Sequence, residues 1–343
     1  MYVRRRIRLS YMLSESWREL GIVAFWSVLV VMLFELAGWT ALVMPVLPVT
    51  LIGIAVSLYL GFKSTSSYNR WWEARQNWGL VIVASRTWAV QVNSLLYDSA
   101  GAASPEVREE LIYRQLGFAY ALAYQLRRTS RLKPGNHKSI FARRRPVDAA
   151  VELLAAPDVY ERFLSAQDRA AARSSSNPAT TLIDRQAERL RDFAQSGMLD
   201  SIRQTAMTSL LAQLLDAQGR CERIKNTPFP RQIAHFGTVF TWIFVLLLPL
   251  AFLDVFEHEA IQHDFTTIAT HRFMYTLVPF TLLISWVFFM MEKISDSSED
   301  PFEGGVHDVP VSAICRTIEI DLRQALGEAA VPPPLAPVDD VLY

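Results

Sequence analysis

The chain is poor in the residues that most catalytic and metal-binding motifs require. Its 343 residues include only two cysteines, Cys221 and Cys315, and six histidines. Two cysteines exclude a disulfide framework and a clustered thiolate metal site. His258 and His263 are spaced one residue too far apart to share a helix face as zinc ligands. No Walker loop, GxSxG elbow or GxGxxG fingerprint is found. We therefore expect no enzyme, no metal and no cofactor.

An excess of charge of one sign is also missing, because 34 Lys and Arg balance 34 Asp and Glu. Basic residues do gather between positions 127 and 145. Such a cluster could contact nucleic acid or acidic lipid, but no aromatic residues are interleaved with it. A solvated face of a cytoplasmic domain is the favoured interpretation, and we expect no nucleic-acid partner.

Long apolar runs are what the sequence has in abundance. They concentrate at residues 20–62 and 233–291, whereas the middle of the chain resembles a soluble helical domain. The first region is too long for one span of about 20 residues. Pro45 and Pro48 supply a break, which predicts a span near 20–40, an external turn at 38–48 and a second helix from about 49. The uncharged runs 236–253 and 273–291 predict the third and fourth spans.

The basic residues predict the orientation of these spans. Five arginines lie in the first 20 residues, and residues 254–271 contain no Lys or Arg. The positive-inside rule then places both termini and the middle region in the cytoplasm. No small-residue cleavage site follows the arginine-rich start, so we expect the first apolar segment to stay in the mature protein.

Glu35 interrupts the first apolar region. Ionisable groups inside membranes are often functional, which would suggest a role in a pore or in gating. Glu35 also lies near the outer end of its span, where it could reach the interface. Both interpretations stay open at this point.

The chain divides into five segments. Residues 1–62 hold the N-terminal segment and the first two spans, and 63–233 form a helical cytoplasmic domain with predicted surface loops at 129–146 and 165–181. Residues 234–292 hold the third and fourth spans. Apolar residues at helical spacing predict a cytoplasmic helix within 293–327. The tail 328–343 contains Pro332, Pro333 and Pro334 and is predicted to be disordered.

The most specific motif follows the second apolar run. Gly61-Phe62 is followed after seven residues by Arg70 and a tryptophan pair, which alone would be an interfacial anchor. Two further elements agree with it, one before the third span and one after the fourth. Together these motifs resemble the bacterial branch of the bestrophin family of ion channels, over about residues 5–326. The motifs are Arg70-Trp71-Trp72-Glu73, Thr227-Pro228-Phe229-Pro230 and Asp300-Pro301-Phe302.

The resemblance implies an all-α integral membrane protein of the bacterial inner membrane, with four transmembrane helices and a large helical cytoplasmic domain. It also implies a homopentamer in membrane lipid around one pore for small monovalent ions. In this family the pore neck ends at the phenylalanine of the Gly-Phe pair. Helical steps back from it give Ile54, Leu58 and Phe62, on one face at 54–62. Without the resemblance these residues would be lipid-facing or packed.

A second constriction is implied at the cytoplasmic end of the pore. Counting from Pro230 points to Ile202, although a packed core isoleucine is the competing interpretation. A neck of Ile, Leu and Phe offers no polar ligand, so it would gate by dewetting. The family favours chloride, but only Phe62 presents a positive ring edge. A channel selective for monovalent cations is therefore an alternative.

Calcium gating is not expected. Calcium takes six to eight oxygen ligands, and the segment 302–308 has Gly304 and Gly305 where carboxylates would be needed. Two further alternatives are a secondary transporter and a membrane scaffold without channel activity. The chain has no inverted repeat that would favour a transporter.

Overall fold

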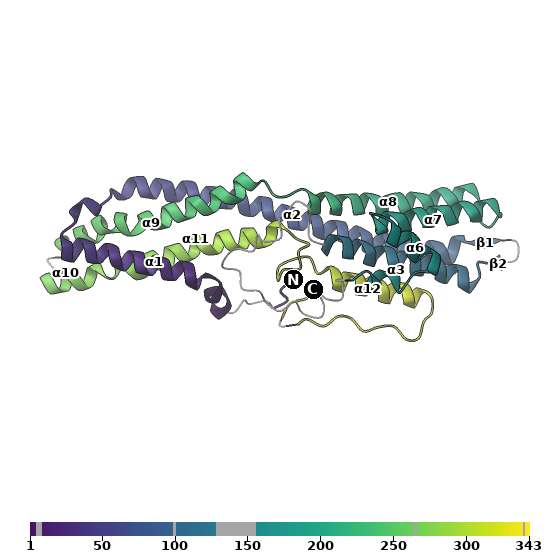
Figure 1. Cartoon of the computed structure of the whole chain (residues 1–343). Helices are drawn as coiled ribbons and strands as arrows, with labels where there is room; N and C mark the ends of the chain where they lie inside the picture. The colour runs from purple at the N-terminus through teal and green to yellow at the C-terminus, as the bar shows by residue number, and fades with distance from the viewer. Residues whose placement is uncertain (5–8, 99–100, 128–155, 264–265, 339) are drawn as a thin grey trace.

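The computed structural model describes residues 1–4, 9–98, 101–127, 156–263, 266–338 and 340–343. It is an elongated helical molecule with a four-helix bundle at one end and a second group of helices at the other (Figure 1). One helix, α2 (Val46–Leu95), runs through both ends. We call the second group, together with the far half of α2, the helical body.

Among the described residues, four helices are long and apolar enough to cross a membrane, and all four lie in the bundle. These are α1 (Leu9–Ala37), the first half of α2, α9 (Arg231–Gln262) and α11 (Leu277–Glu299), with the short α10 (Thr267–Met274) before α11. The four predicted spans are thus confirmed. Helices α9 and α11 both contact α1 and both contact α2, so α1 and α2 lie on opposite sides of them (Figure 1).

The break between the first two spans lies where the prolines predict it. Helix α1 ends at Ala37, and Gly38 follows with a positive φ of 66°, a conformation that favours glycine. A single 3-10 turn, η1 (Thr40–Leu42), leads to Pro45, which precedes α2. Pro48 belongs to the first turn of α2, where its missing N–H removes no helical hydrogen bond. The external turn is therefore shorter than the sequence predicts.

Helix α2 is 50 residues long, which corresponds to about 75 Å. No proline interrupts residues 49–104, so nothing in the sequence stops the helix where it leaves the apolar run. It ends at Leu95, beside a two-stranded hairpin of β1 (Tyr97–Asp98) and β2 (Gly101–Ala102). The same rod thus forms one side of the bundle and part of the core of the helical body.

The remaining helices pack around the far half of α2. They are α3 (Pro105–Arg127), α5 (Asp158–Glu161), α6 (Ala166–Ser174), α7 (Pro178–Gln195), α8 (Ser201–Asn226) and α12 (Val311–Ala325). Trp78, Trp88 and Tyr120 are among the largest fully buried side chains of their common core. Buried charge is paired there: the guanidinium of Arg114 lies 2.8 Å from the carboxylate of Asp168.

The predicted surface loop at 165–181 is wrong, because this stretch holds α6 and the start of α7. Its polar residues begin helices. The Ser165 hydroxyl accepts from the Asp168 amide at 3.1 Å, and the Asn177 side chain accepts from the Thr180 amide at 3.1 Å. Pro178 occupies the first turn of α7, which tolerates proline. The predicted loop at 129–146 lies outside the described residues, as does the basic cluster apart from Arg127.

The predicted disorder of the tail 328–343 is also wrong for its described residues. The Val341 and Tyr343 side chains are buried. The Leu342 amide donates to the Met1 carbonyl at 2.8 Å, and the Ala313 amide donates to the Tyr343 carbonyl at 2.7 Å. The two termini consequently meet (Figure 1). Prolines keep the tail extended, and its last apolar residues fasten it to the rest of the chain.

Candidate pore wall and its anchors

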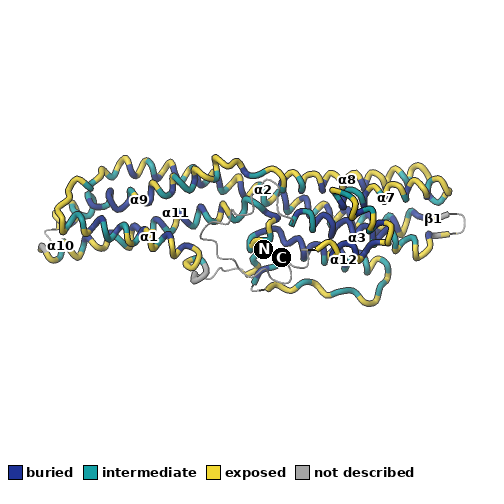
Figure 2. Tube along the Cα trace, in the orientation of Figure 1, coloured by how far each residue is buried: buried dark blue, intermediate teal, exposed yellow. Residues whose placement is uncertain are grey.

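The three predicted neck residues lie on the free face of α2. Ile54, Leu58 and Phe62 are 58%, 61% and 68% exposed. The opposite face of the same turns is buried against α9 and α11, and Leu60 there is fully buried. Figure 2 shows the exposed residues of α2 running along the outer edge of the bundle. The structure therefore brings the three side chains together as one apolar row that is not part of the subunit's buried core.

This row continues along α2 into the helical body. As far as Val83 its further members recur three or four residues apart and carry no charge, and Val90 follows seven residues later, beyond the exposed Arg86. Leu80, Val83 and Val90 are 49%, 60% and 63% exposed although they lie beyond the apolar span. Apolar side chains at this spacing are typical of a surface that packs against another helix. The polar or aromatic members of the row between Phe62 and Leu80 are Thr65, Asn69, Trp72 and Gln76.

Ile202 lies at the end of the helical body that is farthest from the bundle (Figure 1). It is the second residue of α8 and is 81% exposed, so it is not part of the subunit's own core. The helix start is fixed by its neighbours. The Asp200 carboxylate accepts from the Arg203 amide at 2.9 Å, and the Arg203 guanidinium donates to the Leu95 carbonyl at 2.7 Å. Ile202 is thereby held close to the end of α2.

The signature residues join the bundle to the helical body. The Arg70 guanidinium donates to the carbonyls of Ile224 and Thr227, the latter at 2.5 Å. These carbonyls end α8, where the helix dipole favours a cation. The Trp71 indole N–H donates to the His307 carbonyl at 2.9 Å. The signature therefore ties α2 to the end of α8 and to the segment before α12, contacts that the interfacial-anchor interpretation did not include.

The element after the fourth span meets this signature in space. Pro301 and Phe302 are buried, and Phe302 belongs to the core cluster against which Trp71 packs. The Lys225 ammonium, near the end of α8, lies 2.8 Å from the Glu303 carboxylate. Asp300 is half-buried beside Arg70. The structure thus gathers the two motifs at one junction, although more than 200 residues separate them in sequence.

The Asp308 carboxylate is already occupied by partners from the protein. It accepts from the amides of Gly304 and Gly305 at 2.7 and 2.9 Å, and Arg127 lies 3.9 Å away. Burial raises the pKa of Asp308, and Arg127 opposes that rise. Among the described residues there is no group of three or more His, Cys, Asp or Glu that could hold a metal ion.

Glu35 lies near the C-terminal end of α1 with its side chain largely buried, and its carboxylate lies 3.0 Å from Nδ1 of His271 in α10. Helix α1 is separated from α2 by α9 and α11. Glu35 therefore contacts the other spans, and its place in the fold is remote from the free face of α2. It reaches a partner within the chain, which neither sequence interpretation anticipated.

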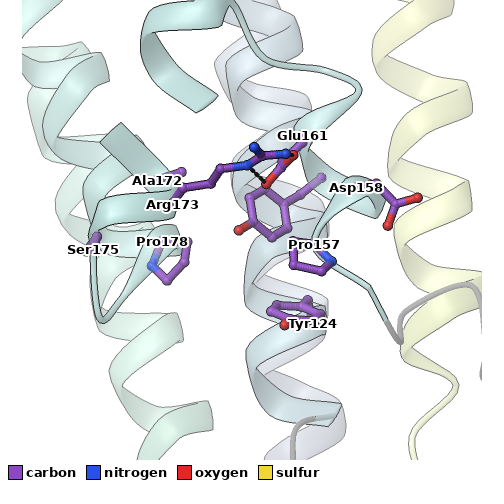
Figure 3. A pocket seen from close by; sticks show the side chains of 9 residues that line it. Tyr124, Pro157, Asp158, Glu161, Ala172, Arg173, Ser175 and Pro178 are labelled. Atoms are coloured by element: carbon purple, nitrogen blue, oxygen red, sulfur yellow. Dashed lines mark hydrogen bonds and ion pairs between the residues drawn. The ribbon is translucent and has the colours of Figure 1, made fainter. Parts of the chain in front are cut away.

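A cavity of about 450 Å³ lies in the helical body between α3, α5, α6 and the start of α7 (Figure 3). Tyr124 and Pro178 line it, and Arg173 pairs with Glu161 across it at 2.5 Å. This hydrogen-bonded pair lowers the pKa of Glu161 and raises that of Arg173. None of the lining residues belongs to α2 or α8, so the cavity is separate from the exposed row.

Sequence reasoning missed Lys63, which follows Phe62 directly. Its side chain is 0% exposed, and its ammonium lies 2.6 Å from the Asp296 carboxylate of α11. The signal was present, since Lys63 is the first charged residue after the second apolar run. Its burial could not be foreseen, because a lysine at that place usually reaches the interface.

Comparison with known proteins identifies the family. Residues 6–324 match the family described as bacterial/fungal bestrophin protein. A protein of Mesorhizobium japonicum named voltage-dependent anion channel-forming protein is 29% identical over 314 residues, which cover 91% of this chain and 85% of that protein. A protein of the same name from Escherichia coli K12 is 26% identical and covers 84% of this chain and 80% of its own length.

Solved structures agree on the fold. A bacterial bestrophin homolog from Klebsiella pneumoniae has a TM-score of 0.73 at 24% identity, and the match covers 91% of this chain and 98% of that one. Together with the family match and the relatives' names, this makes the chain an integral membrane protein of an ion-channel class and not an enzyme. It belongs to the bacterial and fungal bestrophin family.

Proposed function

We propose that the chain is the pore-forming subunit of a channel that conducts small monovalent anions passively. The observation that carries this proposal is the uncharged row on the free face of α2. It begins with Ile54, Leu58 and Phe62 in the bundle, and their exposure contrasts with the fully buried Leu60 beside them. The names of the relatives from Mesorhizobium and Escherichia support anions as the permeating ions.

The row needs copies of the chain around it to become a pore, and we propose a homopentamer. Exposed Leu80, Val83 and Val90 support assembly, because a soluble surface rarely leaves such residues in a line without a partner. Helix α1 lies on the far side of the bundle from α2. In a ring with α2 innermost, α1 would consequently face lipid.

We place both termini and the helical body in the cytoplasm of a bacterium, with the bundle in the inner membrane. The arginine-rich start and the absence of Lys and Arg from residues 254–271 support this orientation. Ile202, highly exposed at the far end of the helical body, would then form a cytoplasmic constriction. The helical body between it and Phe62 would enclose the vestibule.

The neck would gate by hydration. Rings of Ile54, Leu58 and Phe62 would present no polar ligand, so ions would pass only when the ring is wide enough to stay wet. Small movements of α2 would therefore change conduction strongly. Calcium would not control these movements, since Asp308 is already satisfied by two amides and Arg127. Selectivity for monovalent cations is the second candidate, because Ile54 and Leu58 carry no positive ring edge.

Ion flux from liposomes tests the neck. Ile54→Ala, Leu58→Ala and Phe62→Ala should each raise chloride flux in the reconstituted protein, because each widens one apolar ring. Ile261→Ala is a matched control, since Ile261 is 66% exposed at the outer end of α9. Flux equal to wild type in all three neck variants would refute the neck assignment.

A further inference from the structure

The buried Lys63 belongs to the proposed pore helix, follows Phe62 directly and forms an ion pair with Asp296 of α11. Successive residues of an α-helix point about 100° apart, so Lys63 points into the bundle while Phe62 points away from it. The Lys63 side chain is 0% exposed, whereas Phe62 is 68% exposed. Rotation or sliding of α2 that moves the Phe62 ring must also move the Lys63 ammonium.

Lys63 is held from two sides. Its ammonium lies 2.6 Å from the carboxylate of Asp296 on α11, and it is 3.5 Å from the carbonyl of Ala234 in the first turn of α9. Gly237 faces its stem, and a Cβ at that position would lie in ordinary van der Waals contact, 3.4 Å from Lys63 Cδ. One helical turn earlier, the Tyr59 hydroxyl donates to the Ile233 carbonyl at 2.9 Å. The two side chains hold the neck end of α2 against the start of α9.

The surroundings of Lys63 make its position well defined. Glu292 of α11 is buried nearby and accepts from the Thr238 hydroxyl. Lys293 points the other way and pairs with Glu19 of α1 at 2.8 Å. A buried ammonium that loses its carboxylate cannot be rehydrated in place, so its helix is forced to shift or the charge is lost. The pair can therefore hold one rotation of α2 more strongly than apolar packing alone, because lipid tails are as apolar as the side chains and packed helices gain no hydrophobic driving force in lipid.

We propose that Lys63 is a positioning residue of the pore, whose ion pair with Asp296 fixes the rotation of α2 that keeps the Phe62 ring in its narrow position. This inference rests on the proposed channel function. Lys63 does not line the pore and makes no contact with the permeating ion. Its removal should change how often the channel is open and leave the open pore itself unaltered.

Single-channel recording of the purified, full-length protein in planar bilayers tests this. Lys63→Met keeps the apolar stem and removes the charge, and Asp296→Asn removes the partner without changing its size. We expect both to raise the open probability by at least about fivefold, with wild-type unitary conductance and reversal potential. The effects of the two substitutions should not add in the double variant, because both remove the same interaction. Lys63→Arg should restore the wild-type open probability.

Lys293→Met is the matched control. It breaks an ion pair of similar length in the same layer that does not involve α2, and it should leave the open probability unchanged. Asp296 is half exposed at the edge of the bundle, so Asp296→Asn keeps the test valid if Lys63→Met does not assemble. Wild-type open probability in an assembled Asp296→Asn channel would overturn the proposal. A changed reversal potential in Lys63→Met would do so as well, because Lys63 would then act on the ion directly.

The proposed pore and the proposed role of Lys63 can be refuted separately. An absence of current from assembled wild-type protein, or a Phe62→Ala channel identical to wild type, would contradict the proposed pore. The role of Lys63 is overturned by itself when Phe62→Ala alters conduction and the Lys63 and Asp296 variants do not.

Discussion

Truncating two neighbouring positions of α2 should separate conduction from stability. Phe62→Ala removes a side chain that is 68% exposed, whereas Leu60→Ala removes one that is 0% exposed and packed among α2, α9 and α11. The two residues lie on the same helix, two positions apart. They differ in the direction in which the side chain points, into the bundle for Leu60 and away from it for Phe62, so each serves as the control for the other.

The magnitudes follow from these surroundings. Lipid tails are as apolar as leucine, so moving the Leu60 side chain between lipid and the bundle core changes its free energy little. The loss of stability in Leu60→Ala therefore comes mainly from the cavity that the substitution leaves. Leucine truncations in protein cores cost about 2 to 5 kcal/mol with transfer included, and we expect roughly 1 to 3 kcal/mol here from the cavity and lost packing alone. Phe62→Ala leaves no internal cavity and should cost less than about 0.5 kcal/mol within the subunit.

Two assays on the same preparations read the result. Thermal unfolding in detergent, followed by tryptophan fluorescence, should show a lowered midpoint for Leu60→Ala and a nearly wild-type midpoint for Phe62→Ala. Chloride efflux from liposomes should rise for Phe62→Ala, and the efflux per assembled channel should change much less for Leu60→Ala. The reverse pattern, with Phe62 needed for stability and Leu60 for conduction, would refute the assigned orientation of α2.

The remaining expectations concern the junction, calcium and pH. Trp71→Phe loses the indole donor to His307 and should cost about 1 kcal/mol in unfolding free energy, whereas Trp72→Phe, at a 45% exposed position, should cost almost nothing. If the two melt alike, the anchoring role of Trp71 is refuted. Chloride current should not change when calcium is added or chelated, and a saturable micromolar dependence would contradict this. Burial of Asp168 opposes ionisation, but Arg114 and Arg185 hold the pKa of its carboxyl below the usual value. The stability that it contributes is therefore present above the unfolded pKa of about 3.9 and is lost as pH falls through the lower folded value. Melting points of wild type and Asp168→Asn should converge in that acidic range, and a constant difference between them would contradict the pairing.

Hydropathy and the positions of helix-breaking residues predict most of the fold. The four spans, the break at Pro45 and the continuation of α2 past Phe62 all follow from uncharged length and from the positions of proline. Helix geometry also predicts that Ile54, Leu58 and Phe62 lie on one face, since positions i, i+4 and i+8 of a helix share a face. That the face is free is a tertiary fact, decided by which side α9 and α11 cover.

The errors arose where one residue type has two structural meanings. Ser165, Asn177 and Pro178 were interpreted as loop residues, but the same residues begin helices when alanine-rich or amphipathic sequence follows. The prolines of the tail indicate an extended chain, and only contacts with distant residues decide whether that chain is fixed. Val341 and Tyr343 supply these contacts through their burial. Such partners lie too far away in sequence for local patterns to indicate them.

Long-range pairing also explains what was missed at the candidate site. Arg70 and Trp71 were recognised as a motif, but their partners are backbone carbonyls of Ile224, Thr227 and His307, which have no sequence signal. Lys63 was visible as a charge, and its burial depends on Asp296 more than 200 residues away. Motifs therefore indicated which residues matter, and the fold indicated what they hold in place.

The central claim is that this chain forms an anion-conducting pore. The most direct measurement is the reversal potential of single channels of the purified protein in planar bilayers with unequal potassium chloride on the two sides. We expect discrete openings whose current reverses near the chloride equilibrium potential. Reversal near the potassium equilibrium potential would contradict anion conduction, and the absence of openings from an assembled protein would contradict the pore itself.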